Sequence, residues 1–258
     1  RLDHKGHIIG KEEGREMSYK RLIPCIFIDS GKAVRWFDDH TVLSDDVISL
    51  ARYYSEHGAD ELLVFDLSDS DEDHDEAIDL MKKINRVIHI PMVAGGNVKR
   101  QEDVKKILYA GAKRAILNFS KQDSPKLMED AAKRFGKEKI AVSLHDFDAL
   151  FKHQHKIEEC CGEIVFIEEC SSEILFMHRL DLDSVMNVTD IPCVVLTDTN
   201  EKSELFKILK CPGVKGLSGQ YVSRTDMDLS TFKEKCTAQD IKMTSFESIM
   251  EFSQFKTN

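Results

Sequence analysis

The chain contains two segments that repeat one another without a gap at an offset of 101 residues. The first begins at Ile90 and reads IPMVAGGNVKRQEDVKKILYAGAKRAILN; the second begins at Ile191 and reads IPCVVLTDTNEKSELFKILKCPGVKGLSG. Each has the pattern of a strand, a loop, a helix and a second strand, and both share Ile-Pro at the start and Lys-Ile-Leu in the helix. One such unit is too small to bury its own sheet, so the repeat predicts two half-barrels in tandem.

Short apolar runs alternate with amphipathic stretches along most of the chain. The runs are continuously apolar, which favours a parallel sheet covered by helices. Eight of them, each followed by a helical pattern, predict an α/β fold, a closed (β/α)8 barrel of the TIM-barrel type rather than an open sheet. The predicted strands cover Leu22–Ile28, Glu61–Leu67, Ile90–Ala94, Arg114–Asn118, Lys139–Leu144, Glu163–Ile167, Pro192–Thr197 and Val214–Ser218.

The same pattern sets the expected domain boundaries. One barrel is expected over residues 19–243, and 258 residues is an ordinary length for a chain built on a single barrel. Residues 1–18 are expected to be an N-terminal tail, either frayed or left from cloning, with Met17 as the natural start. Residues 244–258 are expected to be a C-terminal extension, either a docking helix or a linker into a further domain.

Composition argues against several classes of function. The formal net charge of -10 disfavours binding to nucleic acid or to anionic membranes. No run approaches the roughly 18 apolar residues of a membrane span, and the first residues lack an apolar signal core, so a cytoplasmic location is expected. The seven cysteines lack metal-binding spacing and are expected to be reduced thiols packed as small apolar side chains. We therefore expect neither a metal nor a cofactor.

Glycines and polar residues follow the third and fourth predicted strands. Gly95 and Gly96 would let the backbone approach a ligand and direct N–H groups at an anion, and Asn118 and Ser120 follow at the same face. Together they predict a phosphate-binding cradle, although Gly-Gly-Asn is also an ordinary turn sequence. In the second repeat Leu-Thr replaces the glycine pair, and only the stretch ending at Gly219 could still offer backbone amides. One phosphate site is expected in the first half, and an eroded one in the second.

The strand ends that would carry acid–base chemistry hold unexpected residues. In the tandem arrangement strand one corresponds to strand five, which makes Phe27 and His145 equivalent. Phenylalanine cannot transfer a proton, whereas proton shuttling on a sugar phosphate needs two positioned titratable groups. Asp29, on the same side of strand one as Phe27, and Asp66, at the end of strand two, could form a site with His145. The alternative is that these are ordinary polar residues facing solvent.

Two further stretches lie near these strand ends. The acidic stretch DLSDSDEDHDEA, residues 66–77, lacks the spacing and the glycine of a calcium-binding loop. It is expected to be solvated and to cap the next helix. Trp36 and Phe37 follow strand one in a loop, where they could form a contact surface or fold over the barrel mouth.

Several stretches of the chain resemble a known family. They read KRLIPCIFIDSGKAVR, GADELLVFDLS, IPMVAGGNVKRQEDVKKILYAGAKRAILN and RFGKEKIAVSL. They are similar to the paired histidine-biosynthesis barrels, namely the cyclase subunit of imidazole glycerol phosphate synthase and phosphoribosylformimino aminoimidazole carboxamide ribotide isomerase. The resemblance is specific over about Tyr19–Leu144 and weak from there to Met243. It implies a two-fold repeated (β/α)8 barrel that binds a substrate with two phosphates.

Carried over residue by residue, the resemblance implies a mixed site. The family's first-half phosphate site corresponds to Gly95, Gly96, Asn118 and Ser120, and its strand-two aspartate corresponds to Asp66. The two catalytic aspartates of the family, by contrast, correspond to Phe27 and His145, so that both carboxylates are replaced.

A narrower resemblance suggests a partner. The stretch AGGNVKRQEDVKKILYAGAKRAILNFSKQ is similar to a barrel fused ahead of phosphoribosyl-AMP cyclohydrolase and phosphoribosyl-ATP pyrophosphatase domains. The tail TSFESIMEFSQFKTN resembles the beginning of that junction, while the zinc-binding cysteines and histidines of the cyclohydrolase itself are absent from this sequence.

These observations lead to one expected function and two alternatives. The expected function is a catalytically degenerate barrel that binds a phosphorylated ribose-type metabolite and serves as an accessory domain of such a fusion. The first alternative is an active sugar-phosphate isomerase or cyclase in which Asp29, Asp66 and His145 have taken over proton transfer. The second is a structural barrel without a ligand, which requires the loop at Gly95 and Gly96 to be closed.

Overall fold

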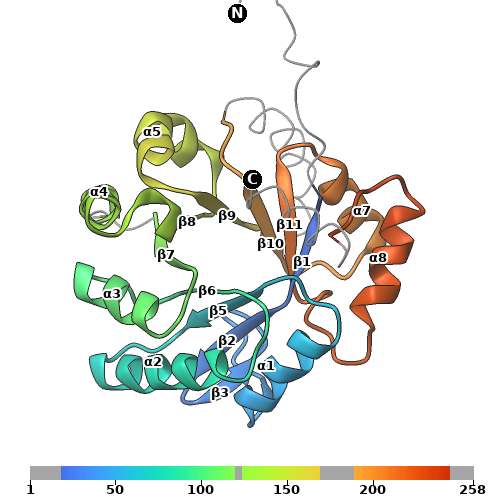
Figure 1. Ribbon diagram of the computed structural model, residues 1–258, viewed down its shortest axis with the longest axis horizontal. Helices are drawn as coiled ribbons and strands as arrows, with labels where there is room; N and C mark the ends of the chain where they lie inside the picture. Colours follow the sequence, from blue (N-terminus) through green and yellow to red (C-terminus); the bar gives the residue numbers. More distant parts are fainter. Residues whose placement is uncertain (1–18, 120–123, 169–188, 245–258) are drawn as a thin grey trace, which may run out of the picture.

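The computed structural model describes residues 19–119, 124–168 and 189–244 of the chain. Strands form the inside of the molecule and helices surround them (Figure 1). Within these ranges, the helices are too short or too polar to cross a membrane.

The barrel closes through its first strand, which Pro24 divides into β1 (Arg21–Ile23) and β2 (Cys25–Asp29). β1 pairs in parallel with β11 (Val214–Gly219), and β2 pairs in parallel with β5 (Leu62–Asp66). The ring continues from β5 to β11 in chain order through β6 (Met92–Gly95), β7 (Arg114–Asn118), β8 (Ile140–Leu144), β9 (Glu163–Glu168) and β10 (Cys193–Thr197). Each predicted strand is present, and the predicted (β/α)8 barrel is confirmed.

Helices alternate with these strands. They are α1 (Val47–Glu56), α2 (Asp71–Asn85), α3 (Gln101–Tyr109), α4 (Ser124–Phe135), α5 (Phe147–Cys160), α7 (Lys202–Lys210) and α8 (Leu229–Thr237), with a 3-10 turn η2 at Lys137–Lys139. The segment between β9 and β10, residues 169–188, lies outside the described residues, as do residues 1–18 and 245–258.

The internal repeat is confirmed in three dimensions. The order β6, α3, β7 in the first half recurs as β10, α7, β11 in the second half. Helices α3 and α7 each have nine residues and begin at equivalent positions, Gln101 and Lys202. The equivalent strands β7 and β11 end at Asn118 and Gly219.

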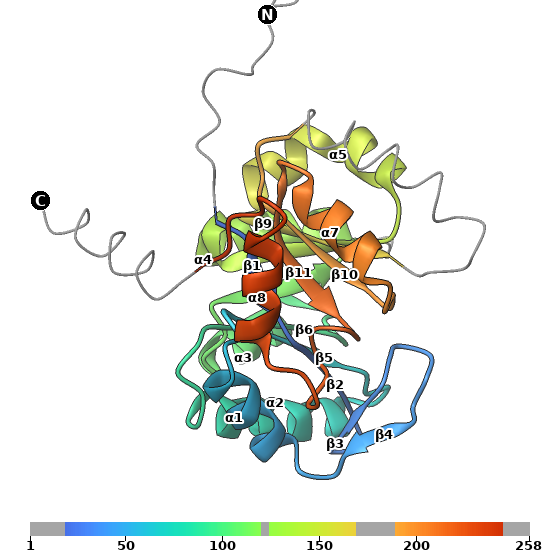
Figure 2. The same cartoon turned by 90° about the vertical axis from the view of Figure 1, so that its right-hand side faces the viewer.

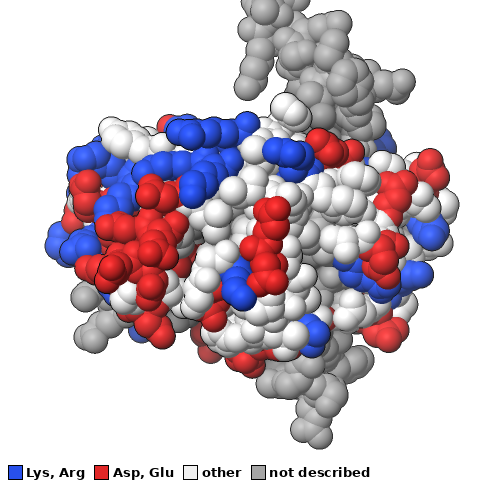
Figure 3. Space-filling view, turned by 90° about the horizontal axis from the view of Figure 1, so that it is seen from below, with Lys and Arg blue, Asp and Glu red and all other residues white. Residues whose placement is uncertain are grey.

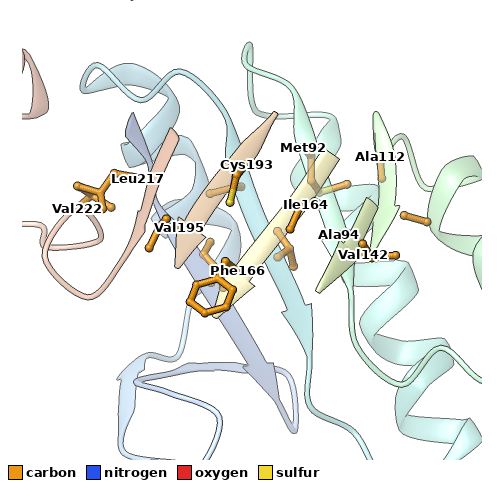
Figure 4. Packing of buried hydrophobic residues seen from close by; sticks show 14 of the residues in the cluster. Met92, Ala94, Ala112, Val142, Ile164, Phe166, Cys193, Val195, Leu217 and Val222 are labelled. Carbon is orange, nitrogen blue, oxygen red and sulfur yellow. The ribbon is translucent and has the colours of Figure 1, made fainter. Parts of the chain in front are cut away.

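Apolar side chains fill both faces of the strand ring. Alternate residues of each strand point outward to the helices or inward to the barrel axis, because successive strand side chains lie on opposite faces. On β10, for example, Val195 belongs to the outer cluster and Val194 to the inner one. Figure 4 shows the outer cluster, where Val195 of β10 lies between Phe166 of β9 and Leu217 of β11.

A short antiparallel hairpin follows the first strand and was not predicted. Ser30 and Gly31, with φ of 49° and 76°, form a tight turn that reverses the chain into β3 (Lys32–Val34), which pairs with β2. β4 (Val42–Ser44) pairs with β3 in turn. Figure 2 shows this hairpin extending from the barrel at the lower right. Its strands are too short to give a periodic sequence signal.

Candidate functional site at the carboxyl end of the barrel

Phe27 lies on the inner face of β2, near the end of the barrel where the active sites of this architecture are found. Its ring makes edge contacts with Trp36 and Phe37, at centroid distances of 5.2 and 4.7 Å, and stacks on Phe65 at 5.8 Å. Phe37 also contacts Phe65 at 5.1 Å. We call these four residues the aromatic plug. Only 3% of the Phe27 surface is exposed, so the plug buries the ring almost completely.

The hairpin supplies half of the aromatic plug. The chain leaves β3 and turns back through a hydrogen bond from the Trp36 backbone N–H to the Asp39 carbonyl, 3.1 Å long. This turn places Trp36 and Phe37 over Phe27 and Phe65 on the barrel strands. Of the two readings that the sequence left open for the Trp36–Phe37 pair, the structure shows the pair folded over the mouth.

Asp29 ends β2 beyond the aromatic plug and is paired with the hairpin loop. Nδ1 of His40 lies 2.7 Å from Oδ2 of Asp29, and the Ser30 hydroxyl donates to Oδ1 at 3.0 Å. The hydrogen bond from His40 lowers the pKa of Asp29, and the same bond raises the pKa of His40. Asp29 therefore serves to hold the loop in the arrangement that the structure shows.

Asp66 points away from the barrel axis, toward α2. Its Oδ2 lies 2.6 Å from Nδ1 of His74, and its Oδ1 accepts from the Ser68 backbone N–H at 2.9 Å. Both Asp66 and His74 are almost completely buried, and Asp103 of α3 lies 4.0 Å from the other ring nitrogen of His74. This arrangement ties β5 to the two helices that follow it.

His145 comes directly after β8 and is exposed. The next residue, Asp146, caps α5 by accepting from the Ala149 backbone N–H at 2.9 Å. Among the described residues, the hydrogen bonds of Asp29 and Asp66 go to other partners, and none joins Asp29, Asp66 and His145 to one another. The structure thus places the three candidate acid–base residues in three separate settings.

Gly95 and Gly96 lie where strands of the barrel itself approach closely. A Cβ atom added to Gly96 would fall 1.9 Å from the Asp66 carbonyl oxygen, and one added to Gly95 would fall 2.7 Å from the Ile116 Cβ. Gly96 also has a φ of 91°, a conformation that side-chain-bearing residues rarely adopt. Packing against β5 and β7 is thus sufficient to require glycine at both positions.

The other predicted cradle residues lie at the ends of equivalent strands. Asn118 is exposed at the end of β7, and Ser120 lies outside the described residues. Gly219 ends β11 with a φ of 121°, and a Cβ there would fall 1.7 Å from the Thr197 carbonyl oxygen. Asn97, which follows the glycine pair, donates from Nδ2 to the Ser68 hydroxyl at 3.1 Å. The loop after β6 is therefore tied to the loop after β5.

The acidic stretch caps α2 as predicted, but it is not a solvated loop throughout: Asp66 belongs to β5, residues 71–77 form the start of α2, and Asp66 and His74 are buried. Ser70 is the N-cap of α2 and accepts from the Asp73 backbone N–H at 3.0 Å. Asp71, Glu72 and Asp73 occupy the first turn, where the helix dipole favours negative charge. Figure 3 shows acidic side chains gathered over this part of the surface beside a band of basic ones. Among the described residues, no group of three or more acidic, histidine or cysteine side chains is arranged to hold a metal ion.

A cavity of about 300 Å³ opens between β2 and the loop that follows β11. Phe27 and Gly219 line it together with Arg35 and Arg224, which sequence reasoning did not single out. Two residues that the sequence does single out, Phe27 and Gly219, lie at this place, and Gly219 is the counterpart of Asn118 in the repeat. Its described lining thus belongs to the first strand, its hairpin, α1 and the second half of the barrel.

Comparison with known proteins shows where this chain belongs. The family model described as "Histidine biosynthesis protein" matches residues 21–172. The chain is 36% identical over 130 residues to imidazole glycerol phosphate synthase subunit HisF of Exiguobacterium sibiricum, covering 50% of this chain and 52% of the relative. It is 38% identical over 130 residues to the same subunit of Flavobacterium psychrophilum, covering 50% and 51%. The chain thus spans about half the length of the curated relatives it matches.

The match and the structure agree on one conclusion. The matched residues run from the first strand past β9, and the barrel with its internal repeat is the fold that the resemblance implies. The chain belongs to the histidine biosynthesis protein family.

Proposed function

We propose that this chain is a catalytically degenerate barrel of the family, which binds a small phosphorylated molecule and does not convert it. The observation that carries the proposal is Phe27, buried in an aromatic plug at the strand end where the resemblance places a catalytic aspartate. A phenyl ring has no proton to exchange, and the aromatic plug leaves only 3% of the surface of Phe27 exposed.

The settings of the remaining candidates support the same view. Asp66 is bound to His74 on the outer side of the strand ring, and Asp29 is bound to His40 in the hairpin loop. A proton carrier must reach the substrate within about 2.6–3.2 Å, or through one water molecule. Of these two carboxylates, Asp29 is the more exposed, and it would have to release His40 before it could act on a substrate.

The ligand we propose is a phosphorylated ribose-type metabolite, held at the carboxyl ends of β7 and β11. Asn118 and Gly219 are equivalent positions in the two halves, as expected for a symmetric ligand with a phosphate at each end. Gly95, Gly96 and Ser120 belong to the same proposed cradle through the family resemblance. The relatives are named as subunits of imidazole glycerol phosphate synthase, which supports a ligand of this class.

We further propose that residues 19–243 act as one accessory barrel beside cyclohydrolase and pyrophosphatase domains. The support for this partner is the resemblance of the sequence from Ala94 onward to barrels fused ahead of those domains. A mixture of this chain with separately produced cyclohydrolase–pyrophosphatase protein should elute as one complex in size-exclusion chromatography, and separate elution would remove the partner from the proposal.

The test of the central proposal is a calorimetric titration with phosphoribosylformimino aminoimidazole carboxamide ribotide, with product measured in the same samples. Binding without product is the expected outcome. Asn118→Ala should weaken binding by about tenfold, the cost of one lost hydrogen bond to a charged group. The matched control is Asn85→Ala, at the exposed end of α2.

The competing function is an isomerase or cyclase that uses Asp29, Asp66 and His145. Product formation that is lost in Asp29→Asn and kept in Asp38→Asn, an exposed aspartate of the same hairpin loop, would establish it and overturn the degenerate reading. If the titration gives no heat and no product, the remaining interpretation is a structural barrel without a ligand.

A further inference from the structure

The cavity beside Phe27 arises from the way the first strand changes partners. β1 pairs with β11 up to the contact of Ile23 with Ser218, and beyond Pro24 the strand pairs with β5 and β3 instead. The backbone N–H of Cys25 donates to the Ser223 hydroxyl, at 2.8 Å, in the loop after β11. The wall between β2 and β11 therefore opens above Pro24. We call the cavity of about 300 Å³ in this opening the seam cavity.

The walls of the seam cavity are held in place by hydrogen bonds between distant segments. The Tyr54 hydroxyl donates to the Ser223 carbonyl at 2.5 Å, and the Tyr53 hydroxyl donates to the Thr225 carbonyl at 2.8 Å. The Ser223 hydroxyl donates to the Gly219 carbonyl at 2.8 Å. These bonds fix the loop after β11 against α1, so the cavity is preformed, as ligand sites usually are.

Two guanidinium groups give the seam cavity its cationic side. Arg35 donates from Nη1 to Asp39 at 3.0 Å, and Arg224 donates from Nε and Nη2 to Asp226 at 2.8 and 2.6 Å. A guanidinium has five N–H donors, so each arginine keeps donors beyond those that its aspartate uses. Asp226 also lines the cavity, and its carboxylate partly offsets the positive charge.

The opposite side of the seam cavity is apolar. Phe27, Leu43 and Leu50 line it, and Leu43 is 54% exposed at the rim. Cys25 lies among them, and burial raises the pKa of its thiol well above the ordinary value, so that it stays protonated and adds no charge. A ligand that fits both sides has an anionic group for the arginines and an apolar body for the leucines and the phenyl ring.

We propose that the seam cavity binds a small amphiphilic monoanion or dianion, an aryl phosphate or an aryl carboxylate. Its volume lies at the lower end of the range of about 300–1,000 Å³ for ligand sites, which favours a single ring with one acidic group over a ribonucleotide with two phosphates. The proposal goes beyond the proposed function, because it concerns a different ligand held by Arg35 and Arg224. The two sites share Gly219, but the seam cavity does not require Gly95, Gly96 or Asn118.

The test uses the protein's only tryptophan. Trp36 contacts Phe27, which lines the cavity, so its fluorescence reports on occupancy. Phenyl phosphate and benzoate are titrated in parallel, and the tighter of the two identifies the acidic group. Phenol and inorganic phosphate test each half of the ligand alone, and each should bind at least about tenfold more weakly than the intact probe.

Some substitutions in the cavity should weaken binding of the probe, and one should strengthen it. Arg224→Gln should weaken binding of the better probe by about five- to tenfold, and Leu43→Asp by more, because it places a negative charge at the rim. Asp226→Asn should tighten binding, because it removes the competing carboxylate. Arg86→Gln, at the exposed end of α2, is the matched control and should change nothing.

Equal affinity in Arg224→Gln, Asp226→Asn and Arg86→Gln would overturn the proposal, as would a response to phenol equal to that to phenyl phosphate. Circular dichroism of each variant, all altered at exposed side chains, shows that the fold is intact. If the aryl probes cause no change in Trp36 fluorescence while the ribonucleotide still binds in the calorimetric titration, this inference is wrong and the proposed function is unaffected.

Discussion

The two ends of the barrel are built from opposite chemistry. At the amino end of the strands, Glu61 and Glu163 are buried on the inner side and bound to cations. Arg21 donates to both of them, at 2.5 Å in the case of Glu163. Lys113 donates to Glu61 at 3.1 Å, and Arg114 to Glu163 at 3.4 Å. At the carboxyl end, the corresponding space holds the aromatic plug.

This difference shows where the chain keeps its charged groups. Catalytic barrels place titratable residues at the carboxyl end of the strands, and conservation of the amino end usually reflects stability. Here the buried carboxylates form an ionic layer at the end where no chemistry is expected. At the carboxyl end, the rings of the aromatic plug stabilise the fold by burial. The contrast supports a barrel that retains its architecture and has exchanged its acid–base groups for packing.

The largest expected loss of stability comes from a change in the aromatic plug at the carboxyl end. Phe27→Ala would leave a void among Trp36, Phe37 and Phe65, and should lower the free energy of unfolding by about 3–5 kcal/mol. Urea denaturation measures the change. Phe151→Ala, which alters an exposed phenylalanine of α5, is the control and should cost less than about 1 kcal/mol. Equal losses in the two variants would show that the rings do not form a packed plug.

The second prediction concerns the ionic layer at the amino end of the strands. Arg21→Met would leave the carboxylates of Glu61 and Glu163 buried with fewer partners, which should cost about 3 kcal/mol. The pKa of Arg21 is raised, because the attraction of the two glutamates outweighs the effect of burial, which acts to lower it. A companion variant, Arg21→Met with Glu163→Gln, should recover part of the loss in the same urea experiment. A double variant less stable than the single one would contradict an ionic layer.

A buried lysine at the amino end predicts a pH dependence. Lys20 donates to the carbonyls of Cys211 and Val214, and burial lowers its pKa to about 8 from an ordinary value of 10.5. Between these two pH values the unfolded chain binds a proton that the folded chain has released, so the free energy of unfolding should rise with pH across that window. The rise should amount to about 3 kcal/mol.

The measurement is the difference between wild type and Lys20→Met across that window, since other groups titrate there as well. The variant should lack the rise, while Lys83→Met, at an exposed lysine of α2, should keep it. Parallel curves for wild type and Lys20→Met would show that the lysine is not the source.

The smallest effect concerns the exposed pair of Asp29 and His40. The folded pKa of His40 is raised and that of Asp29 is lowered, so the pair stabilises the hairpin when both groups are charged. Its contribution should be lost as the pH rises through the folded pKa of His40, above 6.5, and as it falls through that of Asp29, below 3.8. Trp36 fluorescence should change in the first window, and His40→Gln should abolish that change. A pH response retained in this variant would assign it to another group.

The sequence by itself determined the architecture. The runs of apolar residues, the gapless repeat and the acidic start of α2 predicted the strands, the tandem halves and a capped helix, and each is present. These features depend on contacts within one strand or one helical turn, or on the period with which buried residues recur. Both can be inferred from residues that are close together in the sequence. Phe27 was also visible as a residue that cannot transfer a proton.

Only the tertiary structure decided the environment of each site residue. Gly96 meets the backbone of Asp66, the Cys25 N–H meets Ser223, and Asp66 turns toward His74 rather than the mouth. The ionic layer and the seam cavity likewise join residues from opposite ends of the chain, such as Arg35 and Arg224. The physical reason is that strand order, hairpin direction and ring closure bring these groups together, and no local pattern of residues encodes which distant backbone or side chain will be the neighbour.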